Sequence, residues 1–122
     1  MGLDYIMEVD SELSEEDIFC SLEKSGWHDI SESNGEISAY SDGFAFYYNR
    51  KNPPEKIVCE DNREIQFDVK SDIYIRKKGP ASDAPLEGFL NALVQRTDSL
   101  FLVSFQYDSL LYWRDLDGLH KV

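Results

Sequence analysis

Few residues of this sequence combine the types and spacing that catalysis requires. The two histidines, His28 and His120, stand apart, and no recognisable catalytic motif surrounds either of them. A hydrolytic triad needs a nucleophile beside a base that a third group orients, and the G-x-S-x-G motif of such sites is absent. The glycine-rich motifs that hold nucleotide phosphates are absent too. We therefore predict that the chain is not an enzyme, has no catalytic residues and binds no cofactor.

The other residues with chemical potential have simpler structural explanations. Asp115-Leu116-Asp117-Gly118 looks like part of a calcium loop, but the distal glutamate of such a loop has no room before Val122. A glycine-containing hairpin turn explains these residues better. Cys20 and Cys59 are too few for a disulfide framework and lack metal-ligand spacing. We therefore predict no metal site and two free thiols in a reducing cytoplasm. The short basic run Arg76-Lys77-Lys78 is most simply a solvated strand end.

The net charge of the chain limits the classes of partner that it can bind. Against 24 aspartates and glutamates stand 12 lysines and arginines, which gives a formal net charge of −12. Such a surface repels nucleic acids and anionic membranes, because both are negatively charged, and it favours basic proteins. Residues 1–36 hold eleven acidic residues and a single lysine, whereas the remaining 86 residues hold 13 acidic and 11 basic residues. The simpler alternative is that these acids only keep a small protein soluble.

Part of this acidic block has a role within the fold. Glu15-Glu16-Asp17 follows a predicted helix start at Ser14, where carboxylates offset the helix dipole. From the others we predict a partner-binding face that consists of Glu8, Asp10, Glu12, Glu23, Asp29, Glu32 and Glu36. In the competing interpretation, the partner binds aromatic anchors near the C-terminus, such as Tyr107 or Trp113.

Local signals define the elements in the first half of the chain. Apolar and polar side chains alternate over residues 3–9, which is typical of a half-buried strand. Ser14 caps the start of an apolar stripe that Gly26 ends, and Ser41-Asp42-Gly43 is a hairpin turn. In chain order we predict a strand at 3–9, a helix at about 15–25, a loop or short strand at 27–35, and a hairpin of 37–40 with 44–49.

The middle of the chain leaves an alternative open. Asn52-Pro53-Pro54 should interrupt sheet pairing, because proline cannot donate a hydrogen bond to a ladder. We predict a short edge strand at 57–59. The apolar odd positions of residues 64–78 keep one phase across Lys70-Ser71-Asp72, which fits either one bent strand or a hairpin with a three-residue turn.

The last third of the chain contains the clearest helix. Pro85 suits a first helical turn, and the unbroken apolar stripe after it consists of Leu86, Phe89, Leu90, Leu93 and Val94. Strands are predicted at 100–106, 110–114 and 119–122, and aromatic residues at strand spacing are more typical of a core than of a pocket. These elements predict an α+β fold: a single domain over residues 1–122, with a mostly antiparallel sheet and two helices packed on it. No segment approaches the ~20 apolar residues of a membrane span, and the N-terminus does not look like a signal peptide.

Four stretches of this sequence resemble one bacterial family. They are Met1–Tyr5, Ile73–Lys77, Thr97–Phe105 and Leu110–Leu119. Through them the chain is similar to the bacterial swarming-inhibition (Sit-type) immunity proteins of polymorphic-toxin systems. The resemblance implies a protein that binds and blocks a cognate toxin delivered by a neighbouring cell. It assigns no binding residue, because the similar stretches are strands and turns of the scaffold.

Charge and resemblance together predict a cytoplasmic immunity protein that neutralises a cognate toxin of a contact-dependent or polymorphic toxin system. We expect the toxin to be basic. A nuclease would fit, because carboxylates of an inhibitor can imitate the charge of nucleic acid in its groove. The alternative is an acidic mimic of nucleic acid, or another protein-interaction module without catalysis. A small enzyme is the third alternative, which a cleft with titratable groups of perturbed pKa would favour.

Overall fold

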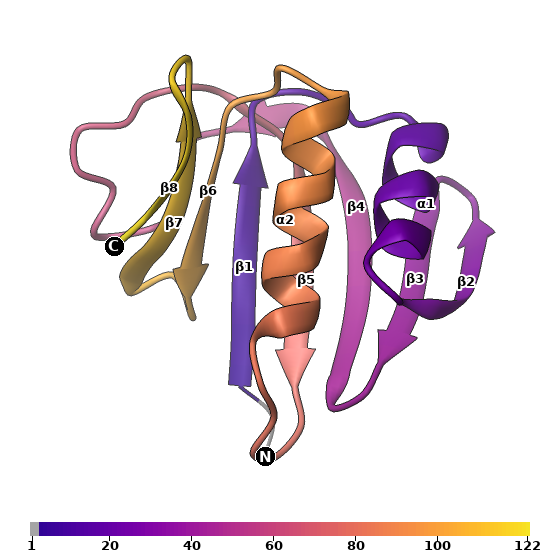
Figure 1. Ribbon diagram of the computed structural model, residues 1–122. Coiled ribbons are helices and arrows are strands. Elements are labelled where there is room, and N and C mark those ends of the chain that lie inside the picture. The colour runs from indigo at the N-terminus through magenta and orange to yellow at the C-terminus, as the bar shows by residue number, and fades with distance from the viewer. Residues whose placement is uncertain (1–2) are drawn as a thin grey trace.

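The protein is built on one sheet of strands with two helices inserted between them in the chain (Figure 1). The computed structural model describes residues 3–122. The elements are β1 (Leu3–Val9), α1 (Glu15–Lys24), β2 (His28–Ser33), β3 (Glu36–Ser41), β4 (Phe44–Glu55), β5 (Val69–Lys77), α2 (Ala84–Arg96), β6 (Phe101–Phe105), β7 (Ser109–Asp115) and β8 (Gly118–Lys121). The eight strands pair antiparallel in the order β2-β3-β4-β5-β1-β6-β7-β8. The predicted α+β fold, with an antiparallel sheet and two helices, is confirmed.

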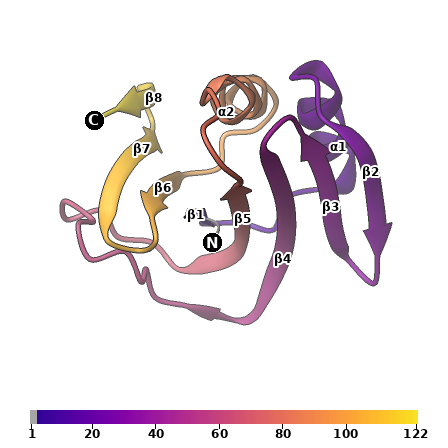
Figure 2. The same ribbon diagram turned by 90° about the horizontal axis from the view of Figure 1, so that it is seen from below.

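The sheet is curved, and both helices lie inside the curve (Figure 2). We call this side of the sheet the helix face. The helices contact each other and bury their apolar stripes against the sheet. Phe46 of β4 and Phe89 of α2, for example, meet edge to face with ring centroids 5.0 Å apart. The opposite side is the outer face, and it is covered in part by residues 56–68, which form neither helix nor strand. We call these residues the covering segment.

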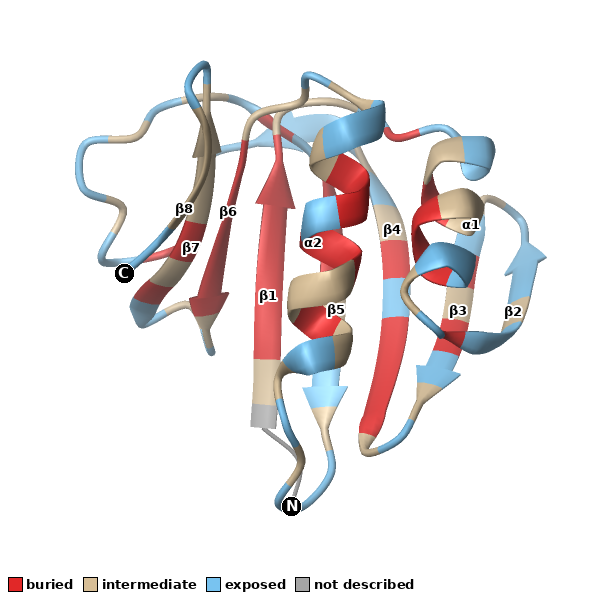
Figure 3. Cartoon of the chain, in the orientation of Figure 1, coloured by how far each residue is buried: buried red, intermediate tan, exposed pale blue. Residues whose placement is uncertain are grey.

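Both helices begin where the sequence predicts. The Ser14 hydroxyl accepts the Asp17 N–H at 3.1 Å and thereby caps α1. Asp83 precedes α2 but makes no cap hydrogen bond with its side chain. Its carboxylate instead accepts hydrogen bonds from the Tyr5 hydroxyl and the Lys77 ammonium, both at 3.3 Å, so it ties α2 to the sheet. The buried residues of α2 lie between Leu86 and Leu93, and both ends of the helix are exposed (Figure 3).

The strand β1 is more buried than its alternation predicts. Ile6 and Glu8, on the outer face, are 3% and 2% exposed, nearly as little as Met7 and Val9 on the helix face. The strand lies between β5 and β6, and the covering segment contacts Glu8. The prediction of a half-buried strand was therefore wrong, and apolar Ile6 on the otherwise polar face was the available signal.

The region around the two prolines differs from its prediction in part. The strand β4 continues through Asn52-Pro53-Pro54 to Glu55, but its register with β5 shifts between Arg50 and Glu55. The prolines thus fall where the ladder is irregular, as expected. Residues 57–59 are not a strand. Two of their N–H groups donate to the side chain of Glu8 rather than to a neighbouring strand.

Neither predicted arrangement of residues 64–78 is right. The strand β5 runs unbroken through Lys70-Ser71-Asp72, which excludes the hairpin. The single long strand is excluded as well, because β5 begins only at Val69. Ile65 and Phe67 belong to the covering segment and pack in a separate apolar cluster on the outer face. The apolar residues of the covering segment and those of β5 thus share one odd-numbered alternation, although they pack on opposite sides of the sheet.

The predicted C-terminal strands and the free thiols agree with the structure. The C-terminal strands form β6, β7 and β8, and the Asp115 carboxylate accepts the Asp117 N–H at 2.8 Å in the last turn. Residues 27–35, left open between loop and strand, contain β2. Cys20 and Cys59 are both free thiols. Among residues 3–122, no helix combines the length and the apolar character needed to cross a bilayer.

Candidate partner-binding surface

Most of the predicted partner-binding carboxylates lie on α1, β2 and β3, at one end of the sheet (Figure 1). The strand β2 is the outermost, and five of its six residues are exposed. The exposed carboxylates of residues 12–36 that pair with no lysine or arginine of the described residues form what we call the acidic edge: Glu12, Glu15, Glu23, Asp29, Glu32 and Glu36. Glu16 of α1 is exposed too, but it pairs with Arg96. Most of the acidic block of the sequence therefore gathers on three adjacent elements.

Little positive charge balances the acidic edge. Residues 10–42 contain ten carboxyl groups and one ammonium group, that of Lys24. Arg96 of α2 reaches this region and pairs with Asp17 at 3.1 Å and with Glu16 at 3.7 Å. Within the part of the chain that the structure describes, no carboxylate of the acidic edge itself pairs with a lysine or an arginine. The field of these groups is thus directed at solvent.

The backbone of the acidic edge suits a charged surface better than it suits strand addition. The register of β2 with β3 shifts between His28 and Ser31, and Asp29 within this bulge has a φ of 52°. At the following turn, Glu32 Oε1 accepts the Gly35 N–H at 2.8 Å. Bulges and charges on an outermost strand prevent its pairing with a strand of another molecule. A partner is therefore expected to meet side chains here, not free backbone groups.

Glu8 does not belong to this surface, and its prediction as a docking residue was wrong. The residue is 2% exposed, and its carboxylate accepts the N–H groups of Val58 at 2.7 Å and Cys59 at 3.1 Å. Burial raises the pKa of Glu8, and the two hydrogen bonds oppose this rise only in part. Glu8 therefore connects β1 to the covering segment and is out of reach of a partner.

Asp10 also has a role inside the fold. Its Oδ1 accepts the Leu100 N–H at 3.0 Å, and its own N–H donates to the Leu100 carbonyl at 3.0 Å. These two hydrogen bonds join the end of β1 to the start of β6. Because Asp10 is half-buried, a charge reversal at this position would disturb the fold as well as any interface.

Part of the outer face is exposed and aromatic, a feature that the sequence analysis missed. Tyr40 of β3 and Tyr47 of β4 are 37% and 41% exposed, and Tyr74 of β5 lies beside them at the border of the covering segment. We call these three residues the tyrosine face. A hollow of about 410 Å³ separates Tyr47 from β2, and another of about 320 Å³ lies between Tyr47 and Arg76 of β5. Tyr47 is thus a ridge between two hollows.

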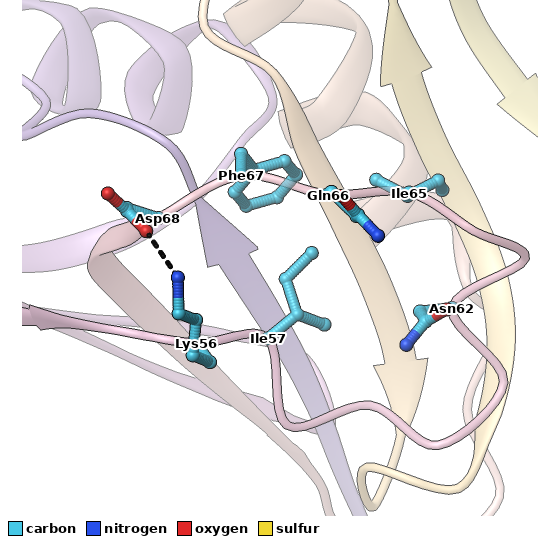
Figure 4. Close-up of a pocket in the computed structure, with 7 residues that line it drawn as sticks. All are labelled: Lys56, Ile57, Asn62, Ile65, Gln66, Phe67 and Asp68. Carbon is cyan, nitrogen blue, oxygen red and sulfur yellow. Dashed lines mark hydrogen bonds and ion pairs between the residues drawn. The ribbon is translucent and has the colours of Figure 1, made fainter.

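A third hollow, of about 560 Å³, opens within the covering segment (Figure 4). Ile57, Ile65 and Phe67 form its apolar sides, and amide groups of the segment lie near its rim. Lys56 Nζ and Asp68 Oδ1 meet at 3.3 Å where the two ends of the segment come together. Both side chains are well exposed, so this ion pair contributes little stability. Apart from this exposed ion pair, the hollow offers apolar and amide contacts.

Several reactive side chains elsewhere have structural roles. Burial raises the pKa of the Cys59 thiol, which keeps it in the unreactive neutral form. His120 Nε2 lies 2.8 Å from Asp115 Oδ1, and its ring stacks on Trp113, so it stabilises the last hairpin. Tyr112 is a core residue. Among the described residues, no three His, Cys, Asp or Glu side chains are grouped to hold a metal ion.

Comparisons of the chain with models of known families, with curated proteins and with solved structures find no match. The class of protein is therefore defined by the fold and its surface alone. It is a small α+β domain whose open features are the acidic edge and the tyrosine face, which share β3. Such features are suited to binding a protein, since charges attract it and aromatic rings give contact area.

Proposed function

We propose that this protein is an immunity protein that binds and neutralises a basic toxin through the acidic edge. The observation that supports this function is the charge distribution: six exposed carboxylates without a lysine or arginine partner among the described residues, five of them on three adjacent elements and Glu12 just before α1. Complementary fields accelerate association by about 10–10³-fold, and an inhibitor must capture its toxin before the toxin acts. We place this action in the cytoplasm, and block of the toxin by occlusion requires no catalysis.

The tyrosine face supplies the aromatic contacts that keep a partner bound, which exposed carboxylates do not provide. Exposed charges mainly set the association rate, whereas buried aromatic contacts set the lifetime of a complex. A tyrosine held on a strand offers a large contact area and loses little side-chain entropy. Glu36 lines the hollow between Tyr47 and β2. Asp4 lines the other hollow but is already paired there with Arg76 at 3.0 Å. A lysine or arginine of a basic partner therefore suits the first hollow, because it can stack on the Tyr47 ring and pair with the Glu36 carboxylate.

Reversal of two charges of the acidic edge should slow binding. For Glu12→Lys with Glu36→Lys, we expect the association rate constant to fall about tenfold or more at ~50 mM salt, and the loss to shrink at ~500 mM. The partner is first captured from the source bacterium with the tagged chain, then purified and mixed in a stopped-flow instrument. Stability should change by less than about 0.5 kcal/mol, because both residues are exposed.

Glu60→Lys with Glu64→Lys is the matched control, because both residues are exposed and lie in the covering segment. This pair makes the same change in net charge and should leave the rate nearly unaltered. Equal slowing by both pairs would show that net charge alone acts, and the acidic edge would not be the site. A captured partner that is not toxic to the cell, or whose toxicity the co-expressed chain does not relieve, would contradict the immunity function. Capture of a DNA-binding enzyme would favour the nucleic-acid mimic instead.

Truncation of Tyr47 should change the dissociation rate rather than the association rate. For Tyr47→Ala, we expect the dissociation rate constant of the same complex to rise about tenfold or more, with association nearly unchanged. Val58→Ala is the control, because Val58 is a 51% exposed apolar residue outside the tyrosine face. If Tyr47→Ala leaves dissociation unchanged and Trp113→Ala accelerates it, the anchors lie in the C-terminal hairpin.

A further inference from the structure

Two buried carboxyl groups lie side by side on the outer face. Glu8 of β1 and Asp72 of β5 are cross-strand neighbours, and each is 2% exposed. Lys51 Nζ of β4 lies 3.2 Å from Asp72 Oδ2. Asp72 Oδ1 has no hydrogen-bond partner among the described residues. Two buried carboxyl groups share one ammonium group, that of Lys51, which is 27% exposed and also lies 3.6 Å from Glu55. The site therefore lacks one positive charge.

The covering segment is held over this site by four backbone N–H groups and an apolar cluster. Its Val58 and Cys59 N–H groups donate to Glu8, and its Glu60 and Asp61 N–H groups donate to the Tyr107 and Asp108 carbonyls at 2.9 and 3.3 Å. Its apolar side chains pack on Leu102 and Leu110, and Arg63 lies over the Trp113 ring. The segment has no helix or strand of its own, so these contacts are what its opening must break. The segment's own Cys59 side chain, which is 1% exposed, points inward and packs against apolar side chains of β6 and β7. Opening would expose the thiol, and this gives the movement a direct reporter.

We infer that the covering segment is a pH-dependent cover, which closes with the uptake of a proton by the Glu8–Asp72 pair and opens more readily as the pH rises. Closure takes Glu8 out of water, and an ionised carboxylate loses more by this transfer than a neutral one. The negative charge of Asp72 beside it adds to the loss. Burial accordingly raises the pKa of both groups in the closed structure. This inference goes beyond the proposed function and does not depend on it.

The other groups around the pair do not account for such an uptake. Those that face it are Lys51 and Glu55 of β4, Tyr74 of β5, Cys59 and Asp61 of the covering segment, and Tyr107 of the β6–β7 turn. Burial raises the pKa of Cys59 and of Tyr107, so both stay neutral near pH 7. Burial lowers the pKa of Lys51, but its contact with Asp72 more than restores it, and the ammonium stays charged. Glu55 and Asp61 are exposed, so the closed structure does not withdraw them from water as it does Glu8 and Asp72. The carboxyl pair is therefore the group that gains the proton.

The reactivity of Cys59 tests the cover. The experiment uses the Cys20→Ser chain, in which Cys59 is the remaining thiol. At each pH, the rate at which the Cys59 thiol reacts with a small aromatic disulfide is measured in the folded chain and in the same chain unfolded in urea, and the first rate is divided by the second. This ratio cancels the ionisation of the thiol and reports opening. We expect this rate ratio to rise between about pH 5 and pH 8. The total rise should be tenfold for each unit by which closure raises the pKa of the Glu8–Asp72 pair. The rise should shrink in Glu8→Gln and in Asp72→Asn, and it should persist in Asp68→Asn, an exposed carboxyl of the same segment.

Hydrogen exchange of the unaltered chain gives a second measurement. The Val58 and Cys59 amides should exchange faster than that of Met7 at the centre of β1, and their advantage should grow as the pH rises. Exchange of all three at one rate would mean that only global unfolding opens the segment, and this would overturn the cover. A ratio that stays flat or falls with pH, or an equal rise in Glu8→Gln and in the parent chain, would overturn it as well.

Discussion

Replacement of Leu90 by alanine should lower the free energy of unfolding by about 2–5 kcal/mol. Leu90 is fully buried at the centre of α2 and belongs to the main core. The substitution removes apolar atoms and leaves a cavity between α2 and the sheet, which close-packed neighbours fill only in part. Urea denaturation of both chains, with the slope held common, measures the difference.

Gln95→Ala is the matched control for this experiment. Gln95 is exposed on the same helix, so we expect a change within about 0.5 kcal/mol. A loss of less than about 1 kcal/mol for Leu90→Ala would contradict the structure, because it would mean that α2 does not bury its stripe against the sheet.

The elements that the sequence predicts correctly have signals within a few residues of one another. The cap at Ser14, the stripe that contains Leu90 and the turn at Asp115 are all local patterns. Helix and hairpin formation depend on such short-range chemistry, and their pairing into one antiparallel sheet follows from the short connections. The fold class could therefore be predicted from the sequence, although the sheet order could not.

The errors concern residues whose surroundings come from distant parts of the chain. Glu8 alternates with apolar residues as a solvated side chain would, and only the arrival of Val58 and Cys59 over it decides its burial. Ile65 and Phe67 continue the phase of β5, yet they pack on the opposite side of the sheet. No local pattern reports a contact between segments fifty residues apart, because side-chain periodicity shows which residues share a face and not what covers that face.

The candidate surface was predicted in part for the same reason. Four of the seven predicted carboxylates lie on α1, β2 and β3, and Glu12 lies just before α1, because these elements are consecutive in the chain and adjacent in space. The tyrosine face was missed, since Tyr40 and Tyr47 could equally belong to a core. Their exposure depends on how far the covering segment extends over the outer face, and its composition alone does not set that limit.

The second large effect on stability concerns the ammonium group of Lys51 beside the buried carboxyl group of Asp72. Lys51→Met should lower the free energy of unfolding by about 3 kcal/mol near pH 7, because it leaves Asp72 buried without a positive partner. Methionine keeps most of the length of the lysine stem, so the loss reports the ammonium group. Lys56→Met is the control: Lys56 is 91% exposed in its ion pair, and we expect a change within about 0.5 kcal/mol.

The pH dependence of this loss distinguishes charge from packing. Burial raises the pKa of Asp72 in the folded chain, and without Lys51 nothing opposes that rise. A carboxyl group with a raised folded-state pKa stabilises the fold fully below its unfolded pKa of about 4, and this contribution is lost as the pH rises through the folded value. The deficit of Lys51→Met should therefore be small near pH 4 and grow toward pH 7, and Lys51→Met with Asp72→Asn should regain most of the stability. A deficit that is equal at both pH values, or that the second substitution does not relieve, would assign the effect to lost packing around the lysine stem.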